Sequence, residues 1–224
     1  VEITNMSLQL DGVDRETLER TWTSSAVSTD GSGRKPAIFD TDRITAFAIG
    51  KPSEAFGEAY EVFDQERIIA RLPGPPYQFL DRITEIDAEA WKLEAGGVIE
   101  AQYDVPRDGW YFDADNQNTM PFAVLLEVGL QPCGWLAAYL GSALTSDIDL
   151  SFRNLGGQGL QHAPVTRDTG VLSTTVKITS VSQSAGMIVQ NYDFEIRSVR
   201  GPIYTGDTYF GFFSKEALVN QIGI

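Results

Sequence analysis

The chain has 224 residues, of which 42% are hydrophobic, and its formal net charge is −14. This length predicts one main core with an extra N-terminal segment, and the composition suffices for a sizeable core. An acidic surface repels phosphate backbones and anionic lipids, which argues against nucleic-acid and membrane-surface binding. No apolar run approaches the ~18 residues of a membrane span, and residues 1–10 lack the pattern of a signal peptide.

The chain has one cysteine, Cys133, and one histidine, His162. A single cysteine cannot form an intrachain disulfide, which fits a reducing, cytoplasmic compartment. A zinc site of cysteine and histidine needs more ligands than the chain has, so we expect no metal and no other cofactor. A catalytic triad would have to use His162, which follows the glycine-rich residues 156–159 and is expected to be an exposed loop residue.

The chain is expected to divide into a leader, residues 1–36, and a domain, residues 37–224, that opens with a helical segment. The end of the leader is rich in serine, glycine and threonine, which predicts a flexible linker. A helix follows, with Asp40 or Thr41 as its cap. Its expected apolar face consists of Ile44, Phe47, Ala48 and Ile49. A Gly-Lys-Pro sequence ends this helix, and one short helical turn comes after it.

From residue 61 onward the pattern changes to that of strands. The expected strands are residues 68–72, 79–86, 96–103, 148–152, 171–181, 187–196 and 203–213. A Pro-Gly-Pro-Pro turn after the first of them is rigid. The fifth alternates polar and apolar side chains over ten residues, which indicates a strand with one face in water.

Between the early and late strands the sequence predicts one long helix. It begins at Pro121, the preferred first helical position, and ends at Gly141. It is apolar nearly all round, so we expect it to be buried, and Pro132 should kink it. Strands, one buried helix and then about four antiparallel strands predict an α+β hot-dog fold, a curved antiparallel sheet wrapped around one long central helix. Such a sheet leaves an edge to cover, so a dimer or a double domain is expected.

Several short stretches resemble the bacterial β-hydroxyacyl-carrier-protein dehydratases, in the same order and at similar spacing. They are residues 72–76 and 80–83, Trp110-Tyr111-Phe112, Met120-Pro121, Leu126-Glu127, Leu130-Gln131, residues 152–155 and residues 204–206. The chain is also similar to the non-catalytic, pseudo-dehydratase hot-dog domains of polyunsaturated fatty acid and polyketide synthases. That likeness is carried by residues 104–110 and 130–135. Together the resemblance runs from about residue 39 to the end.

The resemblance implies a catalytic acid at Glu127, with Gln131 one helical turn later to orient it. In the catalytic members a histidine after the Trp-aromatic-Phe stretch removes the proton next to the thioester. That position falls within residues 113–116, where this chain has no histidine. Carboxylate and amide groups do not replace an imidazole near neutral pH. Phe122 stands where the family has glycine, so only its backbone amide would serve the thioester carbonyl.

Two interpretations stay open for these positions. Glu127 is either the acid of a site that a partner completes or a buried or interface glutamate bonded to backbone amides. The substrate-binding candidates, which an ordinary core would explain equally well, are Trp110, Phe112, Met120, Pro121, Phe122 and Leu126. Asp113 and Asp115 are a weak candidate for paired carboxylates, since a solvated turn explains them better.

Three functions follow from these residues. The first is the pseudo-dehydratase half of a double hot-dog, acting on β-hydroxyacyl thioesters of an acyl carrier protein and inactive when isolated. The second is a hot-dog acyl thioesterase with Glu127 as base, and the third is a purely structural dimerisation domain. Arg67, Arg71 and Arg82 are candidates for a basic patch toward an acidic carrier, although scattered solvated arginines are favoured. Alone, the chain is expected to form a two-fold dimer through sheet edges.

Overall fold

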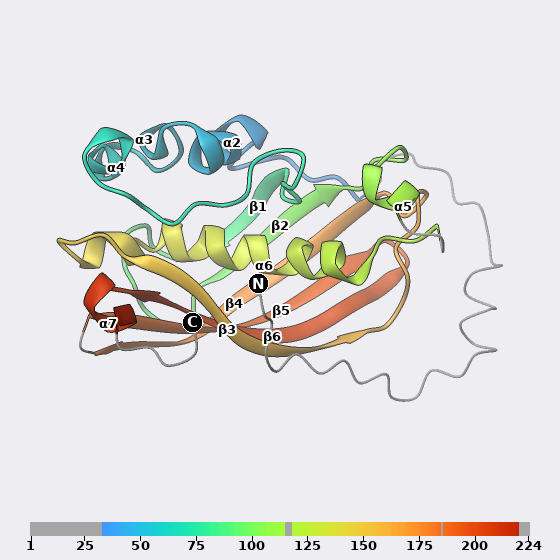
Figure 1. The fold of residues 1–224 in the computed structure, drawn as a ribbon. Helices are drawn as coiled ribbons and strands as arrows, with labels where there is room; N and C mark the ends of the chain where they lie inside the picture. Colours follow the sequence, from blue (N-terminus) through green and yellow to red (C-terminus); the bar gives the residue numbers. More distant parts are fainter. Residues whose placement is uncertain (1–32, 115–117, 185, 220–224) are drawn as a thin grey trace.

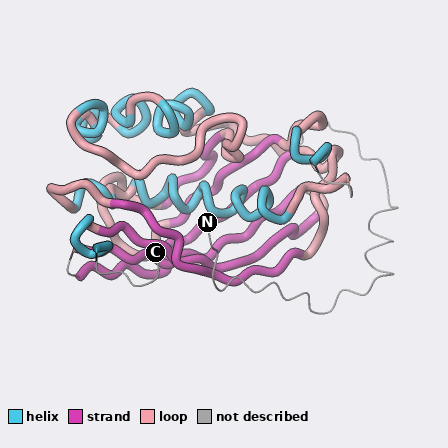
Figure 2. Tube along the Cα trace, in the orientation of Figure 1, coloured by secondary structure: helices cyan, strands magenta, loops and turns pink. Residues whose placement is uncertain are grey.

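The structure, a computed structural model, describes residues 33–114, 118–184 and 186–219. Its centre is one antiparallel sheet of six strands in the order β1-β2-β4-β5-β6-β3, packed on the helix α6 (Figures 1 and 2). The strands are β1 Arg82–Asp87, β2 Val98–Asp104, β3 Ser151–Gln161, β4 Val171–Ser184, β5 Met187–Ser198 and β6 Gly201–Phe213. The central helix α6 spans Phe122–Tyr139. This is the predicted hot-dog fold.

The domain opens with a layer of short helices on the side of α6 that faces away from the sheet (Figure 1). The helices are α2 Thr41–Ile49, α3 Pro52–Phe56, the 3-10 turn η1 Glu58–Tyr60 and α4 Val62–Gln65. Asp40 caps α2 as expected, because its side chain accepts from the Arg43 amide at 3.0 Å. Ile49 does not belong to the buried face, since 67% of it is exposed.

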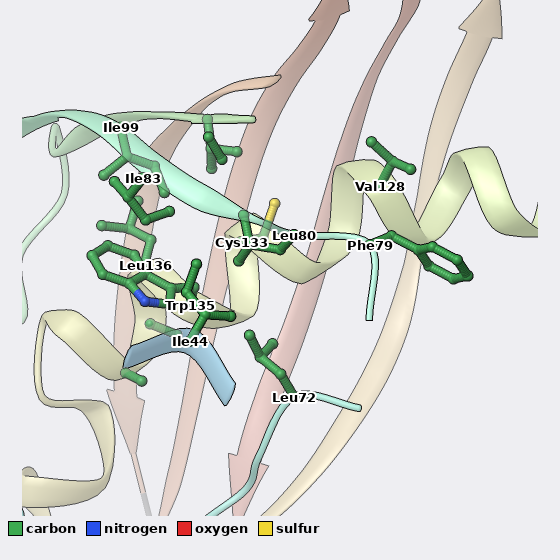
Figure 3. Close-up of a cluster of buried hydrophobic side chains, with 14 of the residues drawn as sticks. Ile44, Leu72, Phe79, Leu80, Ile83, Ile99, Val128, Cys133, Trp135 and Leu136 are labelled. Carbon is green, nitrogen blue, oxygen red and sulfur yellow. The ribbon is translucent and has the colours of Figure 1, made fainter. Parts of the chain in front are cut away.

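The layer packs on α6 through aromatic rings. Trp135, fully buried on α6, stacks on Tyr139 with ring centroids 5.1 Å apart. Phe39 meets the Trp135 ring edge-on at 4.9 Å, and Phe56 lies 5.8 Å from it. Figure 3 shows Trp135 and Leu136 among side chains from several elements, which form one continuous core. The layer is therefore part of the hot-dog core.

The predicted helix matches α6 closely, and its apolar character is that of a core helix. Pro121 is its cap and Gly141, in the left-handed region at φ 80°, follows its end. By length and composition α6 could cross a membrane, but 61% of this segment is buried inside the fold. Gly129 lets the helix approach β5, since a Cβ there would lie 2.5 Å from the Phe194 ring. The helix continues through Pro132.

Two predictions about strands were wrong, since one predicted strand is absent and one predicted connection is part of a strand. Residues 61–72, which include the predicted strand 68–72, form helix α4 and an irregular segment, and Phe63, Ile69 and Leu72 are buried in the core without a sheet partner. The glycine-rich residues 156–159, predicted as a connection, are the middle of β3. A Cβ at Gly157 would meet Asp207 O and one at Gly159 would meet the Tyr204 hydroxyl. Glycine is thus needed there because β3 lies very close to β6.

The other strands agree with the sequence pattern. In β4, Leu172, Thr174, Val176 and Ile178 are buried, as the alternation predicts. The four residues of the expected leader that the structure describes, 33–36, lie against β2. The Lys35 amide donates to Gln102 Oε1 at 3.0 Å, and its ammonium pairs with Glu85 and Glu100. The rest of the expected leader lies outside the described residues. The short helix α7, Lys215–Val219, was not predicted.

The three arginines considered as a basic patch each hold other parts of the chain. Arg67 donates to Ser146 O at 2.8 Å and to the Ile148 carbonyl. Arg71 donates to two carbonyls at the end of α2. Arg82, 4% exposed, binds Gln102 and pairs with Asp104. They do not form a basic patch, and they are not freely solvated either.

Candidate functional site

Glu127 and Gln131 lie one turn apart on α6 and contact each other, as the sequence predicts. The Gln131 amide Nε2 donates to Glu127 Oε2 at 3.2 Å. Glu127 is half-buried, and this burial raises the pKa of its carboxyl group, an effect that the bond from Gln131 partly opposes. Among the described residues, the bond from Gln131 is the one hydrogen bond to the carboxylate. The carboxyl group can therefore hold a proton and donate it from a fixed position.

Gln131 is fixed in turn by the segment before β1. Its Oε1 accepts from the Phe79 amide at 2.7 Å, and its Nε2 donates to Tyr77 O at 2.9 Å. Both amide hydrogens are used, one by the Tyr77 carbonyl and one by Glu127. Gln131 is 2% exposed, so it has no freedom to turn away. The orientation of Glu127 thus depends on a loop that lies about fifty residues earlier in the chain.

Two aromatic side chains lie at the solvent-exposed end of this arrangement. The Trp110 indole N–H donates to Pro76 O at 3.2 Å, and the Trp110 ring lies 6.4 Å from that of Tyr77. Tyr77 also meets Phe79 edge-on, with ring centroids 4.9 Å apart. Tyr77 and Trp110 are 37% and 46% exposed. Trp110 lies on α5, Trp110–Ala114, so the structure brings this predicted residue close to the Glu127 site.

Tyr77 was not singled out from the sequence. Burial raises the pKa of its phenol, and the nearby Glu127 charge raises that pKa further. The one signal in the sequence is the rigid Pro-Gly-Pro-Pro turn directly before it, which fixes where the loop leads. Nothing local shows that the loop would reach α6.

The remaining substrate-binding candidates lie in different surroundings. Phe112 and Met120 are 1% and 3% exposed and belong to the core. Leu126 is half-buried against the core. The Phe122 ring packs edge-on against Tyr204 at 5.9 Å, while Pro121 caps α6. Their contact with an acyl chain stays a prediction.

The position that the family uses for its histidine is only partly described. Asp113 and Ala114 end α5, whereas Asp115 and Asn116 lie outside the described residues. Asp113 forms an ion pair with Arg167 at 2.5 Å. The same guanidinium donates to the Arg107 carbonyl at 2.8 Å and lies over the Phe112 ring at 5.0 Å. Asp113 therefore serves as an arginine partner, and sequence reasoning missed Arg167 entirely.

The single histidine and the single cysteine take no part in the site. His162 directly follows β3 and is exposed, and its Nε2 lies 2.8 Å from Thr205 Oγ1 on β6. Cys133 is buried in α6, its thiol donates to Gly129 O at 3.3 Å, and burial raises its pKa. Among the described residues, His, Cys, Asp and Glu form no group of three or more that could hold a metal ion. The chemistry of the site therefore rests on Glu127.

Comparisons with known proteins agree with the hot-dog fold. The chain is 28% identical over 191 residues to one component of a polyunsaturated fatty acid synthase from Thraustochytrium sp.. The match covers 81% of this chain and 13% of the relative, so the chain spans about an eighth of that protein. The dehydratase heterocomplex ApeI:P from Xenorhabdus doucetiae has a similar fold, with a TM-score of 0.50 at 15% identity. It covers 67% of this chain and 92% of the matched one. Residues 72–203 match the FabA-like domain, and the chain therefore belongs to the FabA-like family of hot-dog dehydratase domains.

Proposed function

We propose that this chain is the pseudo-dehydratase half of a double hot-dog in a cytoplasmic fatty acid or polyketide synthase. It handles β-hydroxyacyl thioesters carried by an acyl carrier protein and lacks its own base. The observation that carries this proposal is the Glu127 carboxyl group, which burial keeps protonable and Gln131 holds in place. The only imidazole of the chain lies beyond β3, bound to Thr205, and is not part of this site.

The proposed reaction uses one group from each hot-dog. An imidazole of the partner removes a proton from the carbon next to the thioester carbonyl. The electron pair of that C–H bond forms the new double bond. The bond from the β-carbon to its hydroxyl oxygen breaks, and Glu127 donates the proton with which that oxygen leaves as water. The amides of Phe122 and Ala123 precede the first backbone bond of α6, in which the Val124 amide donates to Pro121 O. At this helix N-terminus they would hold the thioester oxygen as negative charge develops.

The test compares the chain alone with the chain bound to a histidine-bearing hot-dog domain of the same synthase. The substrate is the N-acetylcysteamine thioester of 3-hydroxydecanoic acid, and enoyl formation and free thiol are both measured. We expect no enoyl product from the chain alone and clear turnover in the complex. Glu127→Gln should lower that turnover by about 10²-fold or more, whereas Glu94→Gln, an exposed control, should not.

Three results would contradict the proposal. Enoyl formation by the chain alone would show that it has its own base. Release of free thiol by the chain alone, lost in Glu127→Gln, would identify a thioesterase. Full turnover of a complex that carries Glu127→Gln would leave the chain with a structural role only.

A further inference from the structure

Gln102 is a buried polar side chain on the outer face of the sheet, the face that does not contact α6. Its neighbours in β2, Ala101 and Tyr103, belong to the core, so Gln102 points to the opposite side of the strand. It is nonetheless only 1% exposed, because residues 33–35 lie against it. A segment from outside the sheet therefore buries a polar group of the outer face.

The side-chain amide of Gln102 binds the main chain of this segment through two bonds. Its Oε1 accepts from the Lys35 amide at 3.0 Å, and its Nε2 donates to Gly33 O at 2.8 Å. A side-chain amide has the donor and the acceptor of a peptide group, so it pairs with the segment as a strand would. Oε1 also accepts from Arg82 Nε and Nε2 also donates to Ser173 Oγ, both at 3.0 Å. The sheet itself thus fixes the amide in the orientation that the segment binds.

The side chains of the segment are basic, and those around this amide are acidic. The Lys35 ammonium lies 2.8 Å from a carboxylate oxygen of Glu85 and 2.7 Å from one of Glu100. The Arg34 guanidinium lies 3.3 Å from Asp104. Ion pairs between exposed side chains contribute less than hydrogen bonds to a buried, fixed group. The amide therefore holds the main chain, and the carboxylates favour basic side chains on it.

The segment crosses the outer face without entering the core. A Cβ at Gly33 would lie 3.0 Å from Val199, in the turn between β5 and β6. At the other end, the Ile38 amide donates to Ile83 O on β1. Residues 34–36 are exposed, and none of them belongs to the hydrophobic core. The segment can therefore leave this face while the core stays intact.

We infer that the outer face of the sheet carries a docking site for a short basic peptide segment and that this chain's own residues 33–36 occupy it as a detachable strap. The residues of the site are Glu85, Glu100, Gln102 and Asp104. The site goes beyond the proposed function, because it lies on the opposite side of the sheet from α6. When the strap is docked, the chain enters the domain across the outer face, and when it is released, an acidic surface with a free amide group is exposed.

The first measurement is hydrogen exchange of the Lys35 amide, followed by NMR in the full chain. Gln102→Leu removes both bonds to the strap and should make this amide exchange about 10-fold faster than in the wild type. The amide of Tyr192, a buried residue of β5, should keep its wild-type rate. The matched control is Glu195→Gln, which removes another partly buried carboxylate that pairs with an arginine, and it should change neither rate.

A second variant keeps Gln102 and alters only the charges. The double substitution Glu85→Gln and Glu100→Gln removes both ion pairs of Lys35 and should speed exchange of its amide by about 3-fold. This variant also tests the inference if Gln102→Leu does not fold. Wild-type exchange of the Lys35 amide in the variants that fold overturns the inference. So does equal acceleration at Lys35 and Tyr192, which would indicate a loss of global stability.

The last measurement supplies the strap as a separate peptide. The full chain with Arg34→Glu and Lys35→Glu should release its own strap, because like charges then face each other. A peptide with the sequence of residues 31–38, GSGRKPAI, should bind this variant and shift the NMR signals of the Gln102 side-chain amide. The same peptide with both basic residues replaced by glutamate should not. The wild type should bind the peptide more weakly, since its own strap is present at high effective concentration. Absence of binding to the charge-reversed variant, or equal binding of both peptides, overturns the docking site.

Discussion

At the scale of single residues, Glu127 should make the stability of the fold depend on pH. Its folded-state pKa is raised by burial, so the unfolded chain loses this proton at a lower pH than the folded chain. The free energy of unfolding of the wild type therefore falls as pH rises from the ordinary glutamate pKa through the raised one, and then levels off. Glu127→Gln has no carboxyl group to titrate and does not show this fall. As pH rises through that range, its free energy of unfolding should increase relative to that of the wild type by on the order of 1 kcal/mol.

Urea unfolding of both proteins at intervals from pH 4 to pH 8 measures this difference. Glu94→Gln alters an exposed glutamate and should show no comparable pH dependence relative to the wild type. A difference in the free energy of unfolding between Glu127→Gln and the wild type that stays constant across this range would show that the fold does not raise the pKa of Glu127.

Gln131 is the residue on which the geometry of the site depends most. Gln131→Leu keeps a side chain of similar size but leaves the buried Phe79 amide without an acceptor and the Tyr77 carbonyl without a donor. We expect a loss of about 2–4 kcal/mol in the free energy of unfolding. Gln158→Leu, an exposed change on β3, should stay within about 0.5 kcal/mol. Equal losses in the two variants, measured by urea unfolding, would contradict this view of Gln131.

The sequence predicts the contact of Glu127 with Gln131 because a spacing of four residues on a helix brings two side chains together. It does not predict Tyr77 or Arg167, whose partners lie about fifty residues away in the chain. Contacts of that kind depend on how the loops cross the finished sheet. A local pattern therefore identified the candidate acid and its orienting amide but not the aromatic residue Tyr77 beside them.

At the scale of elements, the close approach of α6 to the sheet depends on one glycine. A Cβ at Gly129 would lie 2.5 Å from the ring of Phe194, which is buried in β5. At Gly134 in the same helix, a Cβ would lie 3.2 Å from the end of the Leu72 side chain, which can move. Replacing glycine by alanine inside a helix stabilises it by up to about 1 kcal/mol at either position. The two substitutions should therefore differ only through the space available to the added methyl group.

Gly129→Ala should lower the free energy of unfolding by about 1–3 kcal/mol through overpacking. Gly134→Ala should be neutral or stabilising by up to about 1 kcal/mol. Thermal and urea unfolding, followed by circular dichroism, measure both. A stabilised Gly129→Ala would show that β5 and α6 can separate without loss.

Elements were predictable where one periodic pattern determined them. The alternation in β4 and the continuous apolar character of α6 reflect faces that a single element presents. Strand β3 was predicted too short because its glycines are typical of a connection, and only the proximity of Asp207 and Tyr204 on β6 explains them. The irregular segment before β1 has the composition of a strand because its apolar residues fill the core without a sheet partner.

At the scale of the whole molecule, the two edges of the sheet differ. Strand β1 forms one edge, and residues just before α2 cover it, since the Ile38 amide donates to Ile83 O at 2.8 Å and Phe39 bridges the same residue. Strand β3 forms the other edge and pairs only with β6 among the described strands. Its first four residues are exposed. Unpaired backbone groups along such a strand favour pairing with a second chain.

We therefore expect the isolated chain to form a two-fold dimer through β3, and the same edge to receive the partner hot-dog in the synthase. Light scattering at micromolar concentration should give about twice the mass of one 24.6 kDa chain. Hydrogen exchange should be slow in β3 in the dimer and faster after dilution, while exchange in β1 should not change because its edge is already covered. A monomer at micromolar concentration, or a dimer that protects β1 in place of β3, would contradict this assignment.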